Sequence, residues 1–402
     1  RRENGLIKVV TGIRRCGKSY LLFKLYYQYL LDSGIEASRI IRIPLDDDEY
    51  EELRESRRLS VYIKKCITDE GTWFIFLDEV QMCRGFESVL NGLNRRDNLD
   101  IYVTGSNSKF LSTDVLTEFR GRGDEVRVYP LSFSEYVTAY PGDKQDAWID
   151  YYNYGGLPLI LSRKTDELKS RYLIDLCREL YLKDIEERHK LRGDNVMDTL
   201  ANILASAVGS LTNPTKLANT FKSNGIHVSD KTIGVYIGYL LDAFFINKAE
   251  RYDIKGKKYI ASPFKYYFTD IGLRNARLNF RQQEENHIME NIIYNELLVR
   301  GFNVDVGVVE RSERDENGKM IRKKLEVDFV CNRGNQRYYI QSAFAIPDND
   351  KMQQEQKSLV HIGDSFKKII VVKDRIKLWR NEEGIVIMGI MDFLLNPNSL
   401  EL

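Results

Sequence analysis

The sequence has few of the residues that build metal centres and disulfide frameworks. Its 402 residues include 5 cysteines and 4 histidines, and none of them stands in a C-x-x-C or His/Cys cluster. Structural zinc sites and disulfide-rich domains need such clusters, so neither class is expected, and scattered cysteines suit a reducing cytosol. The isolated histidines also give no support to a metal hydrolase or to Ser/His or Cys/His catalysis.

Long apolar runs and an excess of either charge are missing too. No run approaches the roughly 20 apolar residues that cross a bilayer, and no signal peptide is visible, so we expect a cytoplasmic protein without a membrane segment. The chain starts without Met and close to its first strand, which suggests that residues precede it. Lys and Arg number 60 against 59 Asp and Glu, so any nucleic-acid-binding surface must be local.

What the sequence does contain is a phosphate-binding loop at residues 12–19. The segment reads Gly12-Ile13-Arg14-Arg15-Cys16-Gly17-Lys18-Ser19 and matches G-x-x-x-x-G-K-[ST] at every fixed position. The apolar run at 6–10 predicts a buried strand before the loop, and the pattern at 20–31 predicts a helix after it, so backbone N–H groups would face a phosphate. Lys18 is expected to reach the β- and γ-phosphates of a nucleoside triphosphate and Ser19 to ligate Mg²⁺, and Tyr20 completes the predicted set. An ordinary glycine-rich turn is the alternative.

A second diagnostic segment, residues 73–81, is an apolar run that ends in two carboxylates. Such a run is typical of a buried parallel strand. Asp78 is expected to hold Mg²⁺ beside Ser19, and Glu79 to polarise the attacking water. A strand that ends in a solvated acidic pair is the alternative. Further strands are predicted at 40–45 and 100–107.

The predicted strand at 100–107 ends in polar residues, and basic residues come downstream of it. Asn107 or Ser106 is expected to sense the γ-phosphate or to hold the attacking water, although a strand-terminal turn explains both nearly as well. Arg120 and Arg122 alternate with glycines. Either is a candidate arginine finger, in cis or across a subunit interface, and ordinary surface arginines are the alternative.

In their order, these segments resemble the prokaryotic AAA-type ATPases akin to the archaeal ATPase and STAND groups. The resemblance rests on the segments at 12–19, 77–81, 104–106, 121–122, 129–136 and 154–158. It implies an α/β P-loop ATPase core at 1–134 and a helical lid at 135–195. In these proteins a G-x-P element sits against the adenine, a role that the resemblance carries onto Gly156 and Pro158. It is also compatible with a homo-oligomer, because AAA-type rings place arginine fingers in trans.

Three helices followed by a hairpin are predicted between residues 196 and 280, which is the order of a winged-helix domain. Lys231 lies at the front of the third helix, and Lys255, Lys257 and Lys258 make the hairpin tip basic. These lysines are the candidate DNA contacts. The third helix has few of the side chains that read bases, so a packing or regulatory role is the other interpretation.

Residues 281–402 are predicted to form an α/β domain whose motif order resembles the PD-(D/E)xK nuclease core, a restriction-endonuclease-like fold. Glu296 lies on a predicted helix and Asp328 on a strand, but Gln341 and Ala343 occupy the positions where the pattern has Glu and Lys. An amide is a poor Mg²⁺ ligand and a methyl group cannot replace an ammonium. We therefore expect a retained fold without cutting chemistry, unless a migrated lysine such as Lys357 or Lys367 serves.

The sequence as a whole predicts an ATP-binding AAA-type ATPase or switch. Binding or hydrolysis of Mg-ATP would rearrange the winged-helix and nuclease-like parts. Two alternatives stay open. One is a nucleic-acid-binding, processing or defence factor with ATP-gated action on DNA. The other is a regulator or scaffold that binds a protein partner through its C-terminal half.

Overall fold

The computed structural model describes residues 3–105, 119, 121–191, 195–281, 284–314, 320–346 and 349–402. The chain divides into two compact units: Arg1–Pro130 with Asp242–Phe244, and Leu131–Leu241 with Phe245–Leu402. Ser106, Asn107 and Arg120, three of the predicted catalytic candidates, lie outside the described residues.

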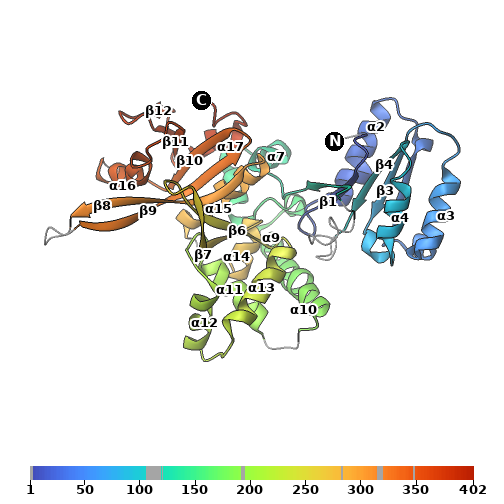
Figure 1. Ribbon diagram of the computed structural model, residues 1–402, viewed down its shortest axis with the longest axis horizontal. Helices are drawn as coiled ribbons and strands as arrows, with labels where there is room; N and C mark the ends of the chain where they lie inside the picture. Colours follow the sequence, from blue (N-terminus) through green and yellow to red (C-terminus); the bar gives the residue numbers. More distant parts are fainter. Residues whose placement is uncertain are drawn as a thin grey trace. The chain divides into compact units, whose positions relative to one another are not determined.

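The first unit contains a five-stranded parallel sheet with the strand order β2-β3-β4-β1-β5 (Figure 1). Its strands are β1 (Ile7–Thr11), β2 (Ile40–Pro44), β3 (Trp73–Asp78), β4 (Leu99–Thr104) and β5 (Gly123–Arg127). The predicted α/β core and its first four strands are thus confirmed. Since β4 separates β1 from β3, polar residues at the carboxyl ends of these three strands meet at one edge, where ligands bind open α/β sheets.

Helices cover both faces of this sheet. Ile75 and Leu77 belong to a core with Leu59 and Leu90, whereas Phe74 and Phe76, which alternate with them along β3, belong to a second core. Residues 18–32 form one helical stretch whose middle turns are π-helical. The helical elements are α1 (Lys18–Tyr20), η1 (Leu21–Tyr26), α2 (Tyr27–Asp32), η2 (Ala37–Arg39), η3 (Asp48–Arg54), α3 (Ser56–Cys66), η4 (Val80–Met82) and α4 (Phe86–Leu93).

The second unit begins with helices, in the range 135–195 for which the resemblance predicts a helical lid. They are α7 (Phe133–Ala139), α8 (Lys144–Tyr154), η5 (Pro158–Ser162), α9 (Asp166–Asp175), η6 (Leu176–Leu182) and α10 (Lys183–His189). The three helices and the hairpin predicted next are also present. These are α11 (Val196–Ser206), α12 (Pro214–Ser223), α13 (Asp230–Asp242), β6 (Ile246–Asp253) and β7 (Lys258–Phe268), after which comes α14 (Ile271–Arg277).

The hairpin β6–β7 belongs to an eight-stranded sheet with the order β12-β13-β11-β10-β9-β8-β6-β7. β6 pairs in parallel with β8 through residues 251–253, so the sheet runs across the predicted domain boundary at 280. This pairing gives the backbone groups of one edge of the hairpin their hydrogen-bond partners. The remaining elements are α15 (Glu285–Val299), β8 (Asn303–Arg314), β9 (Met320–Arg333), β10 (Gln336–Ala343), α16 (Asn349–Val360), β11 (Lys367–Val372), β12 (Trp379–Arg380), β13 (Val386–Gly389) and α17 (Ile390–Leu395). Among the described residues, no helix is long and apolar enough to cross a membrane.

Candidate functional site

The loop 12–19 joins the carboxyl end of β1 to α1 in a conformation that needs glycine. Gly12 has φ 141°, and a Cβ there would lie 2.1 Å from the carbonyl oxygen of Val128, the residue that follows β5. Gly17 has φ 100° at the start of α1. The two fixed glycines of the motif therefore allow the loop to turn close against the backbone that leaves β5.

Lys18 closes this loop from inside. Its Nζ donates to the carbonyl oxygens of Gly12, at 2.9 Å, and Ile13, at 3.1 Å, and the residue is 6% exposed. Both partners are neutral. A phosphate oxygen offers a stronger, charge-assisted hydrogen bond, so an incoming phosphate can take over either interaction.

Ser19 and Asp78 meet as the sequence predicts, and Thr104 joins them. The Asp78 carboxylate accepts hydrogen bonds from the Ser19 hydroxyl, from the Thr104 hydroxyl and, at 3.1 Å, from the Glu79 N–H. Burial raises the pKa of the Asp78 carboxyl, and the two hydroxyl groups oppose that rise. Thr104 was not among the predicted site residues. The feature of the sequence that could have indicated it is a threonine at the carboxyl end of β4, the strand between β1 and β3.

The hydroxyl and carboxylate of Ser19 and Asp78 are hard oxygen donors of the kind that Mg²⁺ prefers. Mg²⁺ in nucleotide sites keeps waters and binds substrate phosphates, so one or two protein oxygens suffice. This pair therefore fits the ion. As the side chains stand, no group of three or more His, Cys, Asp or Glu residues in the described part of the chain is arranged to hold a metal.

Glu79 follows Asp78 at the same edge of the sheet. It has φ 47°, an uncommon conformation for a non-glycine residue, and its N–H also lies 3.4 Å from the Thr104 hydroxyl oxygen. The Glu79 carboxylate accepts a hydrogen bond from the Gln81 amide. This contact restricts the orientation of a carboxylate that stands directly beside the Ser19–Asp78 pair.

Arg122 lies at the amino ends of the parallel strands, whereas the phosphate loop of the same chain lies at their carboxyl ends. The backbone of Arg122 comes just before β5, where its carbonyl accepts from the Ile7 N–H at 2.8 Å, while the loop follows Thr11, the partner of Arg127. Five residues of strand separate the two levels, about 16 Å at 3.3 Å per residue. The expected action of Arg122 in cis is therefore not compatible with this register, and its action in trans stays a prediction. On β5, Arg127 is the residue that pairs with Thr11, at the level of the loop.

The predicted adenine contacts, Gly156 and Pro158, lie in the second unit, where Gly156 has a structural partner. Its N–H donates to Asp270 at 2.7 Å, and its carbonyl accepts from the Leu131 N–H at 2.8 Å. Burial raises the pKa of Asp270 to about 6, although several backbone N–H groups oppose the rise. The adenine role of Gly156 and Pro158 stays a prediction.

In the C-terminal sheet, Asp328 is brought together with Gln341 but not with Glu296. The Asp328 N–H donates to the Gln341 side chain at 3.4 Å, and its carboxylate accepts from the Ser342 N–H at 2.9 Å. Glu296 instead pairs with Arg300 at 2.8 Å. The α15 carboxylate that faces Asp328 is Glu290, six residues earlier and therefore about 240° around the helix from Glu296.

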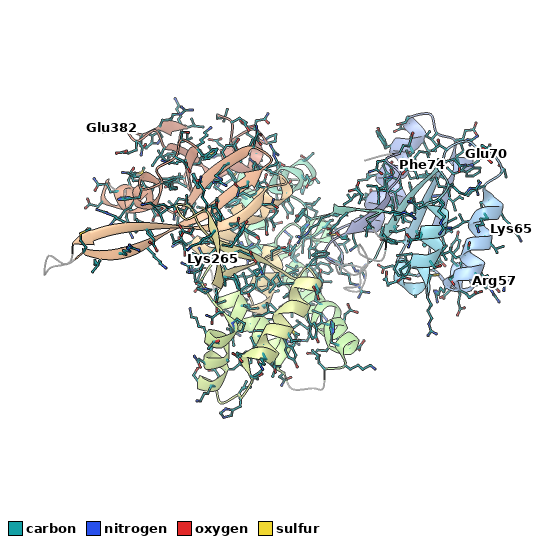
Figure 2. The ribbon with its side chains drawn as sticks, in the orientation of Figure 1. Arg57, Lys65, Glu70, Phe74, Lys265 and Glu382 are labelled. Carbon is teal, nitrogen blue, oxygen red and sulfur yellow. The ribbon has the colours of Figure 1, made fainter. Side chains whose placement is uncertain are left out.

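A lysine outside the predicted set lies between these carboxylates. Lys265 on β7, labelled in Figure 2, has its Nζ 2.8 Å from Glu290, 2.8 Å from Glu326 and 3.6 Å from Asp328. We call these four residues the Lys265 cluster. Burial and the neighbouring Glu290 raise the pKa of Asp328 to about 7, although Lys265 opposes this. The available signal was a charged residue in the otherwise aromatic run at 264–268.

The candidate DNA contacts are solvent-exposed. Lys255, Lys257 and Lys258 lie at the turn between β6 and β7, and Lys231 lies in the first turn of α13. The turn is ordered by Asp253, which accepts from the Gly256 N–H at 2.8 Å. These side chains are accessible to a polyanion, as a contact with DNA phosphates requires.

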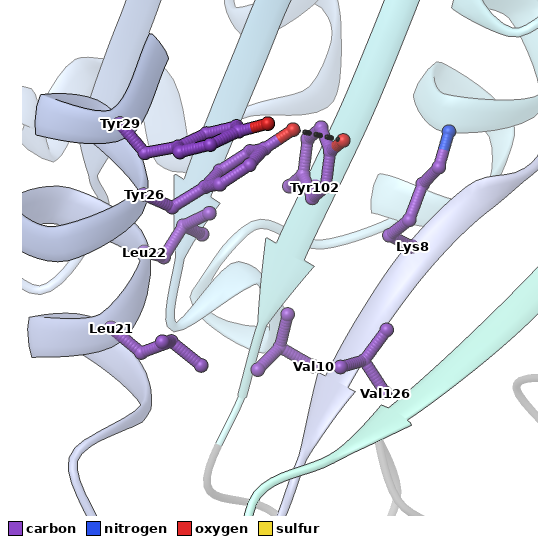
Figure 3. Close-up of a pocket in the computed structure, with 8 residues that line it drawn as sticks. All are labelled: Lys8, Val10, Leu21, Leu22, Tyr26, Tyr29, Tyr102 and Val126. Atoms are coloured by element: carbon purple, nitrogen blue, oxygen red, sulfur yellow. Dashed lines mark hydrogen bonds between the residues drawn. The ribbon is translucent and has the colours of Figure 1, made fainter. Parts of the chain in front are cut away.

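A pocket of about 360 Å³ lies between the helical stretch 18–32 and strands β1, β4 and β5 (Figure 3). It is lined by Lys8, Val10, Leu21, Leu22, Tyr26, Tyr29, Tyr102 and Val126. The hydroxyl groups of Tyr26 and Tyr102 share a hydrogen bond of 2.6 Å. Since the lining is mainly apolar and contains no residue of the loop 12–19, this pocket is distinct from the phosphate site.

Comparisons with known proteins bear on both units. A family profile described as "AAA domain" matches residues 4–137, and one described as "Domain of unknown function (DUF8612)" matches residues 145–284. An "Uncharacterized protein" of Haemophilus influenzae is 33% identical over 402 residues, which cover 98% of this chain and 95% of that protein. Another, of Methanocaldococcus jannaschii, is 29% identical over 361 residues, or 86% of this chain and 76% of that protein. The solved Walker-type ATPase of Pyrococcus abyssi has 16% identity and a TM-score of 0.46, over 69% of this chain and 92% of that one.

Proposed function

The chain belongs to the same family as its Haemophilus influenzae relative and contains an AAA domain at residues 4–137, and we propose that it binds Mg-ATP at residues 12–19 and hydrolyses it to operate a conformational switch. The observation that carries the proposal is the hydrogen-bonded set Ser19–Asp78–Thr104 beside a loop that already encloses the Lys18 ammonium. Such pre-orientation lowers the cost of organising the site when the substrate arrives.

The residues divide the chemistry between them. Lys18 exchanges its loop carbonyls for phosphate oxygens and neutralises their charge. Mg²⁺ held by Ser19 and Asp78 would add positive charge at the β- and γ-phosphates. Glu79 orients a water and accepts its proton as the water oxygen bonds to the γ-phosphorus. The bond from that phosphorus to the bridging oxygen breaks, and ADP and phosphate leave.

The direct test is equilibrium binding of a fluorescent ATP analogue together with phosphate release, each with and without Mg²⁺. We expect saturable binding, and phosphate release only with Mg²⁺. A protein that binds no nucleotide under either condition contradicts the proposal, while binding without release limits the function to a nucleotide-held switch.

We further propose that the nucleotide state reaches the rest of the chain through the end of β5. The Val128 carbonyl oxygen, beside Gly12, accepts from Cys16 Sγ at 3.5 Å. The neighbouring Arg127 guanidinium lies over the rings of Tyr129, at 4.9 Å, and Phe244, at 4.5 Å. Phe244 lies in the turn that joins α13 to β6, so a shift of the loop has a packed route to that turn.

Phe244→Ala tests this route. We expect the variant to bind ATP as the parent does, but to lose ATP-induced changes in amide hydrogen exchange in α13 and β6. Phe366→Ala is a matched control, because it removes another aromatic ring stacked on an arginine, Arg337 at 5.4 Å. An unchanged ATP response in Phe244→Ala counts against the route.

DNA binding is the second candidate function, favoured by the exposed lysines at the hairpin tip. Phosphate contacts from Lys255, Lys257 and Lys258 would make duplex affinity fall steeply with salt. Changing all three to Glu should lower the affinity and reduce the slope of log affinity against log salt by about 3. Duplex binding that persists unweakened removes the tip as the contact, and a parent protein without DNA affinity favours the regulator or scaffold alternative.

Arg122 could act as an arginine finger only on the phosphate loop of a second copy of the chain. In an oligomer it would reach the loop of a neighbour, so mixing Lys18→Ala with Arg122→Ala protein should restore part of the hydrolysis that each variant lacks. Mass measurement with and without ATP shows whether copies associate. Lack of complementation in an associated mixture excludes the finger role.

A further inference from the structure

In the Lys265 cluster, the ammonium group of Lys265 occupies the position among three carboxylates that a bound cation would take. Its three carboxylates come from two elements, Glu290 from α15 and Glu326 and Asp328 from β9, and all three face one ammonium. Lys265 is 3% exposed. The Tyr267 hydroxyl adds a hydrogen bond of 2.7 Å to the Glu290 oxygen that Lys265 contacts.

The local structure explains why these groups converge. Lys265 and Tyr267 are two residues apart on β7, and Glu326 and Asp328 are two residues apart on β9. Since side chains two positions apart point to the same side of a strand, each pair lies on one face. β6 and β7 shift register between Ala249 and Arg251, and β8 and β9 shift between Asp305 and Gly307. Such irregularities bend strands, which helps β7 to reach the cluster although β6 and β8 separate β7 from β9 in the sheet.

The resemblance to a nuclease core implies a divalent cation at Asp328, but the residues present do not fit one. The position surrounded by carboxylate oxygens holds Lys265 Nζ at ammonium–carboxylate distances of 2.8 Å, and Mg²⁺ would need oxygen ligands at about 2.0–2.1 Å around an empty centre. A metal entering here must first displace a buried ammonium from its partners. Gln341 adds only a neutral amide.

We propose that Lys265 permanently replaces a divalent cation in this cluster, so that the chain binds no metal there and becomes a metal-binding protein at this site when Lys265 loses its charge. The inference is independent of the proposed ATP chemistry. Without the ammonium, the buried carboxylates of Glu290 and Asp328 and the partly exposed carboxylate of Glu326 face one another, an arrangement that either takes up protons or captures a cation.

Lys265→Met tests the proposal, with Mn²⁺ as the probe and Asp78→Asn as the common background, so that the phosphate loop does not contribute. Free Mn²⁺ is measured by its electron paramagnetic resonance signal, and unfolding by thermal melting. The Lys265→Met protein should remove about one Mn²⁺ per chain from solution. Its melting temperature should rise by about 5–10 °C at Mn²⁺ concentrations near 100 times Kd. The protein with Lys265 intact should show neither effect.

Two further variants separate metal capture from the loss of a buried ion pair. Lys169→Met removes a buried lysine that, in the described part of the chain, forms an ion pair with the single carboxylate of Asp150, so it should destabilise the chain without creating Mn²⁺ binding. Adding Asp328→Asn to Lys265→Met should abolish the new binding.

Each outcome decides the question. Mn²⁺ binding by the protein with Lys265 intact, lost in Asp328→Asn, overturns the proposal and makes this a resident metal site. Lys265→Met protein that binds no Mn²⁺, or that does not fold even in its presence, overturns it as well, because the metal should take over the role of the ammonium. Protein that folds only with Mn²⁺ supports it.

Discussion

Lys18 in the first unit and Lys265 in the second are both buried cations, but their partners differ in charge. Lys18 donates to two neutral carbonyl oxygens of its own loop and, among the described residues, takes part in no ion pair. Lys265 faces three carboxylates. The loop therefore keeps uncompensated positive charge, which attracts a phosphate, whereas the Lys265 cluster is net negative and repels one.

This difference separates two sites that look alike as lists of residues. Each combines a lysine with carboxylates, which is the usual material of phosphoryl-transfer chemistry. Only in the loop is the lysine free to exchange its partners for substrate. The first unit therefore has an open site, and the C-terminal sheet has a closed one.

The largest expected effect is on the open site. Lys18→Ala should weaken ATP binding by about 1000-fold, because two charge-assisted hydrogen bonds are lost. The stability of the chain should hardly change, since the lost partners are neutral carbonyls. Titration with a fluorescent ATP analogue measures the first effect, and Lys24→Ala, an exposed lysine on the same helix, is the control. If Lys18→Ala retained the ATP affinity of the parent, Lys18 would not be a phosphate-binding residue and the loop would not be an open site.

At the closed site, loss of the lysine should lower the stability of the chain rather than its affinity for ATP. Lys265→Met, without added metal, should lower the free energy of unfolding by about 3–5 kcal/mol, since it leaves buried carboxylates without their counter-charge. Hydrogen exchange of the α15 amides in denaturant measures the change, and ATP affinity should be that of the parent. If Lys265→Met lost ATP affinity while its stability stayed unchanged, Lys265 would act in nucleotide binding rather than in stabilising the C-terminal sheet.

Glu79→Gln should separate catalysis from binding within the open site. The amide keeps the size of the side chain but cannot accept the proton of the attacking water, so phosphate release should slow by about 100-fold while ATP stays bound. Retention of radiolabelled ATP after gel filtration checks the trapped state. Glu51→Gln, on the exposed segment η3, is the matched control, and hydrolysis at the parent rate excludes Glu79 as the base.

The smallest effect is expected at Thr104. Thr104→Val removes the hydroxyl that donates to Asp78, and groups that orient a metal ligand typically contribute about 10-fold in metal affinity. The Mg²⁺ concentration needed for half-maximal hydrolysis should rise by that factor, while Thr104→Ser should behave as the parent. An equal rise in both variants would show that the methyl group, not the hydroxyl, matters.

The open site was largely predictable from sequence. The residues of the loop are contiguous, so the spacing from Gly12 to Ser19 already implies the geometry between β1 and α1. Asp78 and Glu79 could be assigned because an apolar strand that ends in two carboxylates, downstream of a phosphate loop, is typical of a P-loop core. Thr104 was missed because its role depends on β4 lying between β1 and β3, a pairing that no local pattern indicates.

The closed site was not predictable in the same way. The motif order selected Glu296, yet the helix turns that residue toward Arg300 and presents Glu290 to the Lys265 cluster. A lysine was sought on β10, at Lys357 or at Lys367, while the lysine at the cluster comes from β7, more than sixty residues before Asp328. Strand register also places Arg122 at the amino end of β5, away from the phosphate loop of the same chain, so its action in trans is the part of that prediction that stays open.

Local spacing was enough to predict the α/β core, the phosphate loop and its acidic partners, because it fixes which backbone groups and side chains share a strand end. Which charges neutralise one another in the C-terminal sheet could be read from the three-dimensional arrangement alone. Ion pairing depends on distances of a few ångströms between residues far apart in the chain, and those distances follow from strand pairing and bends rather than from any contiguous motif.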